Sequence, residues 1–473
     1  MSEGPLWTVA GIGRHCRGFA RGNLAALLSG QAVLTLVNVA LLIMINRVYA
    51  RPGDATDVGR LAAVLSLMTA VVLLAVSGIA VGLTRRISLA RVAGGAERTM
   101  TIGRAIGGGI TLAAVSGFAM MLLGLVAPPV VYAAAKAWWP EQAPKIEPYV
   151  GAIQLAALWL PGLSLGLVFS AVFDGFQRMR WSLLAEAGTF QVLRLAAAAA
   201  AMLVAGWAWT GLIGAWAGAY ALAAVLMGLE LWVLLSLERQ PVAWRQLPLG
   251  GMVRDAVVMF LPTVAPMLFS QAGVLVAWVA VGDQGAATFW VTWSLAVAVT
   301  AICWPAGRVL LPAIPGLLRN ADLKEVARVF RLAFWGASGV AFLFIAAVGA
   351  VKGWLLTCLN QEGQGAILTV LLAAGFFEAV RVVFNPVLLG SGAERSLALL
   401  EWVSLAVILI GGSAAAAIWG VPGLVAVFVA VFALSMAFRI RLLAQVTGVR
   451  LWREVALATA AVVGLTAVFI VVE

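Results

Sequence analysis

Apolar residues along this chain gather into thirteen long runs, separated by short segments rich in polar and charged residues. Each run approaches the roughly 20 residues that a helix needs to cross a hydrocarbon layer about 30 Å thick. The pattern therefore predicts an all-α polytopic membrane protein. The runs are 22–48, 59–83, 105–127, 149–173, 181–205, 212–236, 255–281, 287–307, 332–351, 364–389, 397–418, 422–443 and 455–472.

An internal repeat and a family resemblance, both described below, lead us to expect two lobes of six transmembrane helices around a central cavity. We expect a cytoplasmic basic segment 1–21, a first lobe 22–236, a cytoplasmic linker 237–254 and a second lobe 255–443. The run 455–472 is apolar enough for a thirteenth span. No connection is long enough to be a soluble domain, so we expect all function within the membrane.

Composition agrees with this interpretation and excludes several classes of protein. The chain is 63% hydrophobic and 11% charged, with a mean hydropathy of +1.04, whereas a soluble domain has about 25% charged residues. The first 21 residues lack the pattern of a cleavable signal. Cys16, Cys303 and Cys358 are far apart, and His15 is the single histidine, so no metal or cofactor is expected.

The basic residues fall mainly in alternate connections. With the N-terminus inside, 23 of the 31 Lys and Arg lie in inner segments and six in outer ones. This bias predicts a multi-pass protein of the cell (inner) membrane with a cytoplasmic N-terminus. It also explains the net charge of +11 without a nucleic-acid partner. Among the connections, 84–104 is predicted to be inner and 128–148 to be outer.

Two distant segments resemble each other in sequence. Residues 168–186 align without gaps to 383–401, with seven of 19 positions identical, and 210–222 resembles 422–434. Each match pairs one span with the span six places later. Spans that are an even number of places apart cross the membrane in the same direction. The two lobes are therefore predicted to be parallel repeats related by an axis along the membrane normal.

Several loop residues carry a resemblance to a known family. The first span ends in Asn46-Arg47-Val48-Tyr49, and a short loop ending at Gly59 follows. The second span ends in Gly82-Leu83-Thr84-Arg85-Arg86, and the turn 174–180 reads Asp-Gly-Phe-Gln-Arg-Met-Arg. These features resemble the polysaccharide transporters, flippases for lipid-linked oligosaccharides, within the multidrug/oligosaccharidyl-lipid/polysaccharide exporter superfamily. The resemblance implies a lipid-linked saccharide substrate, membrane lipid and polysaccharide assembly proteins as partners.

Among the charged residues inside spans, Arg194, Glu378 and Arg381 are candidates for a site, because lipid penalises a charge at the bilayer centre by at least roughly 2.5–3.5 kcal/mol. Arg194 lies about 20 Å along its span at 1.5 Å per residue. It either meets a substrate phosphate, pairs with an acid such as Glu230, or extends outward to the membrane surface. Glu378 and Arg381 lie three residues apart on one helical face. They form either a self-neutralising pair or a site where phosphate competes with Glu378 for Arg381.

The first span adds neutral polar residues. Gln31, Thr35 and Asn38 share one helical face, where they either hydrogen-bond sugar hydroxyls or hold helices together. Arg47 lies at the outer end of this span. Gln271, in the seventh span, corresponds to Gln31 in the repeat.

Missing motifs narrow the function further. The sequence contains no G-x-x-x-x-G-K-[ST] loop and no H-E-x-x-H motif. We therefore expect a transporter rather than an enzyme, one that flips an anionic lipid-linked oligosaccharide to the outer leaflet by alternating access. The alternative is a multidrug or metabolite exporter of the same fold. An intramembrane glycosyltransferase or ligase fits the sequence less well.

Overall fold

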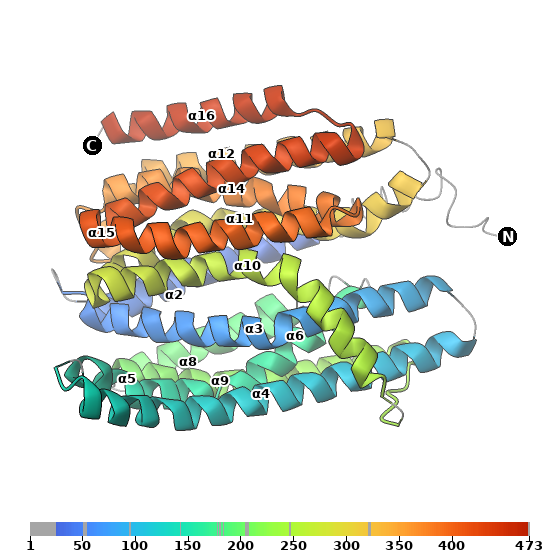
Figure 1. Cartoon of the computed structure of the whole chain (residues 1–473), viewed down its shortest axis with the longest axis horizontal. Coiled ribbons are helices and arrows are strands. Elements are labelled where there is room, and N and C mark those ends of the chain that lie inside the picture. Colours follow the sequence, from blue (N-terminus) through green and yellow to red (C-terminus); the bar gives the residue numbers. More distant parts are fainter. Residues whose placement is uncertain are drawn as a thin grey trace.

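The computed structural model of the chain describes residues 25–50, 54–93, 96–141, 143–176, 178, 181–182, 184–203, 208–245, 247–319 and 323–471, and these are helical almost throughout (Figure 1). The predicted segment 1–21 lies outside the described residues. The first half of the chain contains α2 (Ala25–Tyr49), α3 (Thr56–Ala93), α4 (Ala96–Trp138), α5 (Ala143–Ala157), α6 (Leu160–Gly175), the π-helix η2 (Leu184–Gln191), α8 (Val192–Leu203) and α9 (Trp209–Leu237). The second half contains α10 (Leu249–Val281), α11 (Asp283–Arg319), α12 (Leu323–Ala350), α13 (Lys352–Cys358), α14 (Gly365–Gly390), α15 (Glu394–Thr447) and α16 (Trp452–Val471).

The helices have the length and apolarity of membrane spans. Nine described helices qualify, or ten if α5 and α6, which meet at 45°, form one broken span. α16 is among the nine. Two shorter apolar stretches, Thr35–Tyr49 and Thr189–Leu203, lie on the first and fifth predicted spans. Each of the thirteen apolar runs therefore has a helix or helix pair in the described part of the chain.

α15 comprises two spans rather than one. A straight helix of its 54 residues would be about 80 Å long, far more than the hydrocarbon core. Gly420 interrupts it with φ 66° and ψ −152°. An added Cβ on Gly423 would lie 2.4 Å from the Ala415 carbonyl oxygen, so the chain folds back closely at this point. The halves correspond to the predicted spans 397–418 and 422–443.

The extent of the predicted connections is wrong in two places. α4 continues to Trp138 and α5 begins at Ala143, so most of the expected outer loop 128–148 is helical, Pro128 and Pro129 included. α3 continues to Ala93, which makes most of the connection 84–104, predicted to be inner, helical as well. A charged residue interrupts the apolar pattern in the sequence, but the helix can continue through it. Proline is tolerated in a membrane helix because neighbouring groups satisfy the freed carbonyls.

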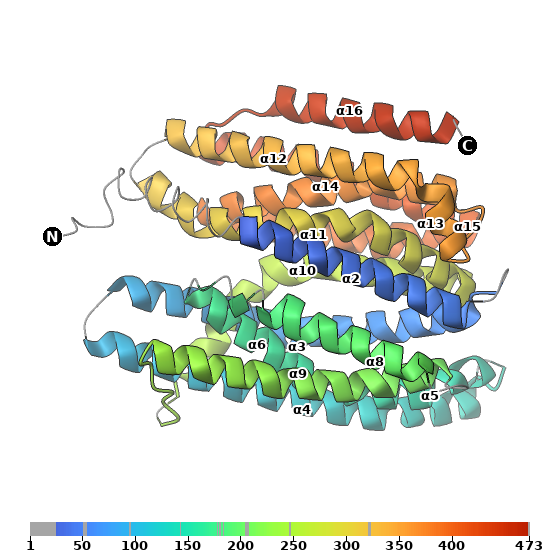
Figure 2. The ribbon, with the colours of Figure 1, turned by 180° about the vertical axis from the view of Figure 1, so that it is seen from behind.

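The helices pack as two groups that meet along a seam (Figures 1 and 2). α3, α4, α5, α6, α8 and α9 contact one another, and α10, α11, α12, α14, α15 and α16 form a second set of contacts. α3 packs along α10 and α11, and α2 packs along α11. α2 and α3 are the first and second spans, and α10 and α11 are the seventh and eighth. In a six-span repeat α3 therefore corresponds to α11 and α10 to α2, so the α3–α10 contact corresponds to the α2–α11 contact. This is the pairing that a parallel repeat predicts.

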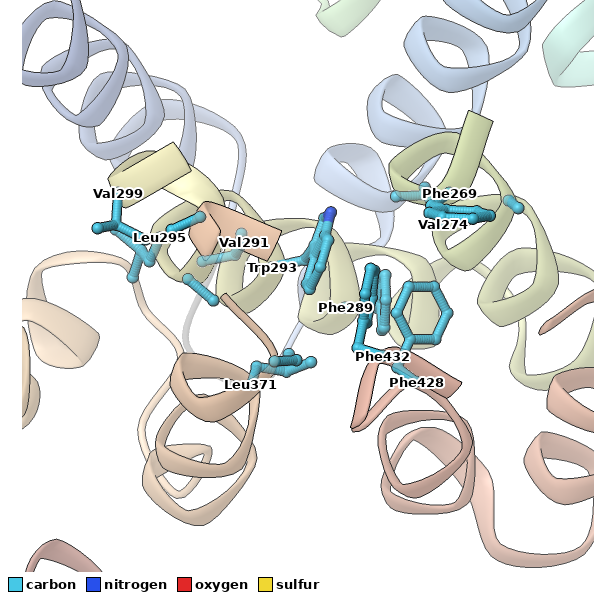
Figure 3. Close-up of a cluster of buried hydrophobic side chains, with 14 of the residues drawn as sticks. Phe269, Val274, Phe289, Val291, Trp293, Leu295, Val299, Leu371, Phe428 and Phe432 are labelled. Atoms are coloured by element: carbon cyan, nitrogen blue, oxygen red, sulfur yellow. The ribbon is translucent and has the colours of Figure 1, made fainter. Parts of the chain in front are cut away.

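An aromatic core holds the second group together on the seam side (Figure 3). Phe428 of α15 lies with its ring centroid 5.1 Å from that of Phe289 and 5.4 Å from that of Trp293, both on α11. Phe432 of α15 lies 5.7 Å from Phe269 of α10. These edge-on contacts stabilise aromatic pairs beyond the apolar area that they bury. They fix one half of α10 against α11 and α15.

Membrane orientation can be tested on two exposed polar positions. Thr101 lies near the start of α4, in the segment predicted to be inner, and Glu141 lies between α4 and α5, in the one predicted to be outer. In a variant without native cysteines, we expect an impermeant maleimide to label Glu141→Cys in intact cells. Thr101→Cys should react only after permeabilisation, because the basic residues favour the cytoplasm for its side of the membrane. The reverse pattern would contradict the orientation.

Candidate functional site

Glu378 and Arg381 form an ion pair within α14. The guanidinium Nε of Arg381 donates to Glu378 Oε2 at 2.6 Å, and Nη2 donates to Oε1. Only 6% of Glu378 and 9% of Arg381 are exposed. The Arg381 guanidinium also lies 5.7 Å from the ring centroid of Phe269 on α10. Of the two roles that the sequence left open, the structure has the residues in self-neutralising contact.

The pair belongs to a larger network that includes α15. Glu401 accepts hydrogen bonds from Arg439 and from Asn385, the latter at 2.9 Å, and lies 3.5 Å from Arg381 Nη1. Arg439 Nε also donates to Asn385 Oδ1 at 3.0 Å. Glu401 and Arg439 are completely buried. Two carboxylates and two guanidiniums therefore balance in charge inside the second helix group.

The role of Arg439 was not predicted from the sequence, where this residue counts among the inner basic residues. Arg439 is 38 residues from Glu401. On a continuous helix they would be about 57 Å apart. They meet because the chain folds back at Gly420. The reversal itself was predicted, since the apolar runs 397–418 and 422–443 end and begin beside Gly420, but the contact between Arg439 and Glu401 was not.

Arg194 has a different environment on α8, directly after the π-helix η2. Its Nη1 donates to Gln191 Oε1 at 3.1 Å, and its guanidinium lies 5.0 Å from the ring centroid of Trp216 on α9. Trp216 Nε1 in turn donates to the Arg194 carbonyl oxygen at 3.1 Å. π-Helical turns occur often at functional sites. The sequence gave no sign of this one.

Arg194 and Glu230 do not form the ion pair that the sequence left open. Glu230 instead accepts a hydrogen bond from Thr189 Oγ1 at 2.7 Å. In the part of the chain that the structure describes, Arg194 forms no ion pair, and its Nε is buried without a hydrogen-bond partner. A half-buried guanidinium thus lies in a membrane span with a neutral amide as its hydrogen-bond partner.

The remaining predicted site residues lie on α2 and α10. Thr35 is buried, Asn38 is half-buried and Arg47 is exposed at the end of α2, while the side chain of Gln31 is outside the described residues. Gln271 is half-buried on α10. α2 packs on α11 and also contacts η2 and α8, so this helix lies where the two helix groups meet.

A polar cluster, here called the latch, joins the two groups at one end of the bundle. It consists of Arg60, Tyr149, Trp278 and Asp283. Arg60 Nε of α3 lies 3.2 Å from Asp283 Oδ2 at the start of α11. The Tyr149 hydroxyl of α5 donates to Asp283 Oδ1. Trp278 Nε1 of α10 is 2.7 Å from the Tyr149 hydroxyl and 3.1 Å from Asp283 Oδ1. One carboxylate therefore binds donors from both helix groups.

Two further contacts, both to backbone carbonyl oxygens, hold the helices together at the latch end of the bundle. An added Cβ on Gly59 of α3 would lie 1.7 Å from the carbonyl oxygen of Asp283, so only glycine allows this approach. Nearby, Asn360 Nδ2 donates to the Ala50 carbonyl oxygen at 3.0 Å and ties the end of α2 to the segment before α14. In the sequence alone, Gly59 marks only the end of a short loop.

An apolar cavity of about 260 Å³ adjoins the latch. It lies between α3, α4, α5 and α6, with Met68, Met120, Tyr149 and Leu160 in its walls. Pockets that bind drug-sized ligands usually measure about 300–1,000 Å³ and carry a few polar groups. The cavity is smaller than that, and Tyr149 belongs both to its wall and to the latch.

Comparison with known proteins adds information at the level of the fold. No protein-family model and no curated protein sequence matches the chain. The structure, however, resembles the outward-facing conformation of a multidrug resistance MATE family transporter of the MOP superfamily, with a TM-score of 0.67 and 13% identity over 93% of this chain and 99% of that chain. It also resembles an inward-facing MATE conformation, with a TM-score of 0.63 and 16% identity over 87% of this chain and 95% of the other.

A third similar structure is a MOP superfamily transporter from Pyrococcus furiosus, described as having a binding pocket of reverse polarity. Its TM-score is 0.64 and its identity 16%, over 89% of this chain and 94% of that chain. Identities this low establish a fold and leave the function open. The expected all-α polytopic architecture is confirmed, and the chain is a multi-pass membrane protein with the fold of the MOP superfamily transporters.

Proposed function

We propose that this protein flips an anionic lipid-linked oligosaccharide, a saccharide unit on an isoprenoid phosphate carrier, from the cytoplasmic to the outer leaflet. The fold supports transport by alternating access, since similar structures are described in both inward-facing and outward-facing conformations. The cargo is inferred from residues of this chain, because proteins of one fold can bind very different molecules.

The half-buried Arg194 is the observation that carries the proposal. It forms no ion pair in the described part of the chain, and its Nε has no partner. A charge in a membrane span normally faces a partner or a cavity. Guanidinium is suited to phosphate because its planar fork donates two parallel hydrogen bonds. A phosphate that reaches Arg194 would gain such bonds without first displacing a carboxylate.

Arg381 and Glu378 enter the same proposal at a later step. A phosphate would have to displace Glu378 from Arg381 inside a buried network, so this contact requires the helices of the second group to separate. Residues on α2 and α10 are proposed to contact the saccharide, because α2 lies at the meeting of the two groups and α10 packs along α3. They are Gln31, Thr35, Asn38 and Arg47 on α2, and Gln271 on α10. The isoprenoid tail would stay in lipid, and polysaccharide assembly proteins would act on the exported unit.

Liposome reconstitution tests the role of Arg194. We expect Arg194→Ala to reduce the transfer of a fluorescent polyprenyl-diphosphate oligosaccharide between leaflets by about tenfold to a hundredfold, the equivalent of the 1.5–3 kcal/mol of a hydrogen bond to a charged group. Arg194→Lys should restore part of the transfer, because the charge returns without the fork. Transfer is measured as the fraction of the probe protected from a membrane-impermeant quencher.

Arg395→Ala is the matched control, since Arg395 is exposed at the start of α15 and should leave transfer unchanged. Normal transfer by Arg194→Ala would contradict the assignment of Arg194. Transport of a cationic dye without any transfer of the lipid-linked probe would instead favour a multidrug exporter.

A further inference from the structure

We propose that the apolar cavity beside the latch binds a hydrocarbon chain of a membrane lipid, and that this binding stabilises the latched conformation. The inference goes beyond the proposed function, because it does not depend on which molecule the protein transports. It rests on three features of the cavity: its walls, its opening and its shared residue with the latch.

The walls select an apolar ligand. All of the lining side chains are apolar except the Tyr149 phenol, which is engaged with Asp283. An apolar cavity of about 150 Å³ stays dry and binds benzene or xenon. The cavity here is larger, at about 260 Å³, and has the same character. Water, a sugar or a phosphate would find no free hydrogen-bonding side chain there, whereas a hydrocarbon segment needs none.

The opening faces the bilayer. α4 has the smallest buried share of the nine described candidate spans, 11%, so most of its apolar surface faces lipid. Leu123 and Val131 line the cavity, yet they are 58% and 55% exposed. They therefore form a rim between the cavity and the lipid-facing surface of α4. Deeper in, Met68 and Leu160 are buried, with 4% and 1% exposed. A lipid chain can thus enter sideways from the membrane.

Tyr149 connects the cavity to the latch. Its ring lines the cavity, and its hydroxyl donates to Asp283 and accepts from Trp278. In the structure the latch is closed, and the Tyr149 ring then forms one wall of the cavity. A ligand that binds one conformation better than another shifts the population toward it. A hydrocarbon chain in the cavity should therefore favour the closed latch.

Photolabelling tests the binding site. The protein is reconstituted in phosphatidylcholine liposomes containing a phospholipid with a diazirine in its acyl chain, and labelled residues are mapped by mass spectrometry. We expect labelling of Met68 and Leu160, which lipid at the outer surface does not reach. Leu123→Trp should abolish this labelling by filling the rim. Leu122→Trp is the matched control, because Leu122 is also 58% exposed but does not line the cavity.

Labelling confined to exposed residues of α4 would overturn the site, as would equal labelling of Met68 in the two tryptophan variants. The coupling has its own test, since linkage between a ligand and a conformation is reciprocal. Asp283→Asn weakens the latch and should therefore reduce the labelling of Met68. Unchanged labelling in a folded Asp283→Asn protein would overturn the coupling to the latch.

Discussion

Replacing Arg439 with methionine should destabilise the protein by about 3–5 kcal/mol, because removing one member of a buried ion pair leaves an uncompensated charge. Arg439 is completely buried, and its Nη2 donates to an equally buried Glu401. Without Arg439, Glu401 would keep Asn385 at 2.9 Å and Arg381 at 3.5 Å, and Arg381 already neutralises Glu378. The loss of stability should appear as a lower midpoint temperature of thermal aggregation in detergent. The aggregation is measured by size-exclusion chromatography of heated samples.

Two further variants separate charge imbalance from other causes. Arg441→Met is the matched control, because Arg441 lies two residues later on α15 and is exposed. It should leave the midpoint close to that of the unmodified protein. The double variant Glu401→Gln with Arg439→Met should recover much of the stability, since it leaves Glu378 and Arg381 balanced. A double variant no more stable than the single one would show that charge imbalance is not the cause.

The apolar runs predicted the helices well because a membrane span must be about 20 apolar residues long. Their pattern carries no information on how far a helix continues into water, which is why α3 and α4 extend beyond the predicted limits. The chain reverses its direction at Gly420 through a single residue with a positive φ angle. The consequence of this reversal, the burial of Arg439, depends on tertiary packing that one sequence does not display.

The candidate site was predictable only where both partners lie on one helix. Glu378 and Arg381 are three residues apart, and their contact follows from helical periodicity. The latch joins Arg60 and Asp283, which are 223 residues apart, and both sit at the ends of spans where charges need no special explanation. Arg194 stood out because of its depth in a span. The absence of an ion pair with Glu230 could be seen only in the structure.

Replacing Asp283 with asparagine should shift the protein toward a conformation that is open at the latch end. The carboxylate binds Arg60, Tyr149 and Trp278 together, and they come from both helix groups. Hydrogen bonds to a charged group contribute about 1.5–3 kcal/mol each, and partly exposed ion pairs less. Since every 1.4 kcal/mol changes an equilibrium about tenfold, a population shift of at least about tenfold is expected. Spin labels on Glu141→Cys and Glu362→Cys, both exposed at this end, should then report longer distances.

Asp57→Asn is the control for this shift. Asp57 also bonds Arg60, at 3.4 Å, but both residues lie on α3, so the contact does not join the two groups. Its loss should leave the distance distribution unchanged. A charge swap then identifies which part of the latch dominates. Arg60→Asp with Asp283→Arg restores the ion pair but leaves the Tyr149 and Trp278 donors facing a guanidinium that accepts no hydrogen bond. We expect the swapped protein to remain open. A return to the short distance would show that the ion pair alone closes this end, and that Tyr149 and Trp278 serve only as packing.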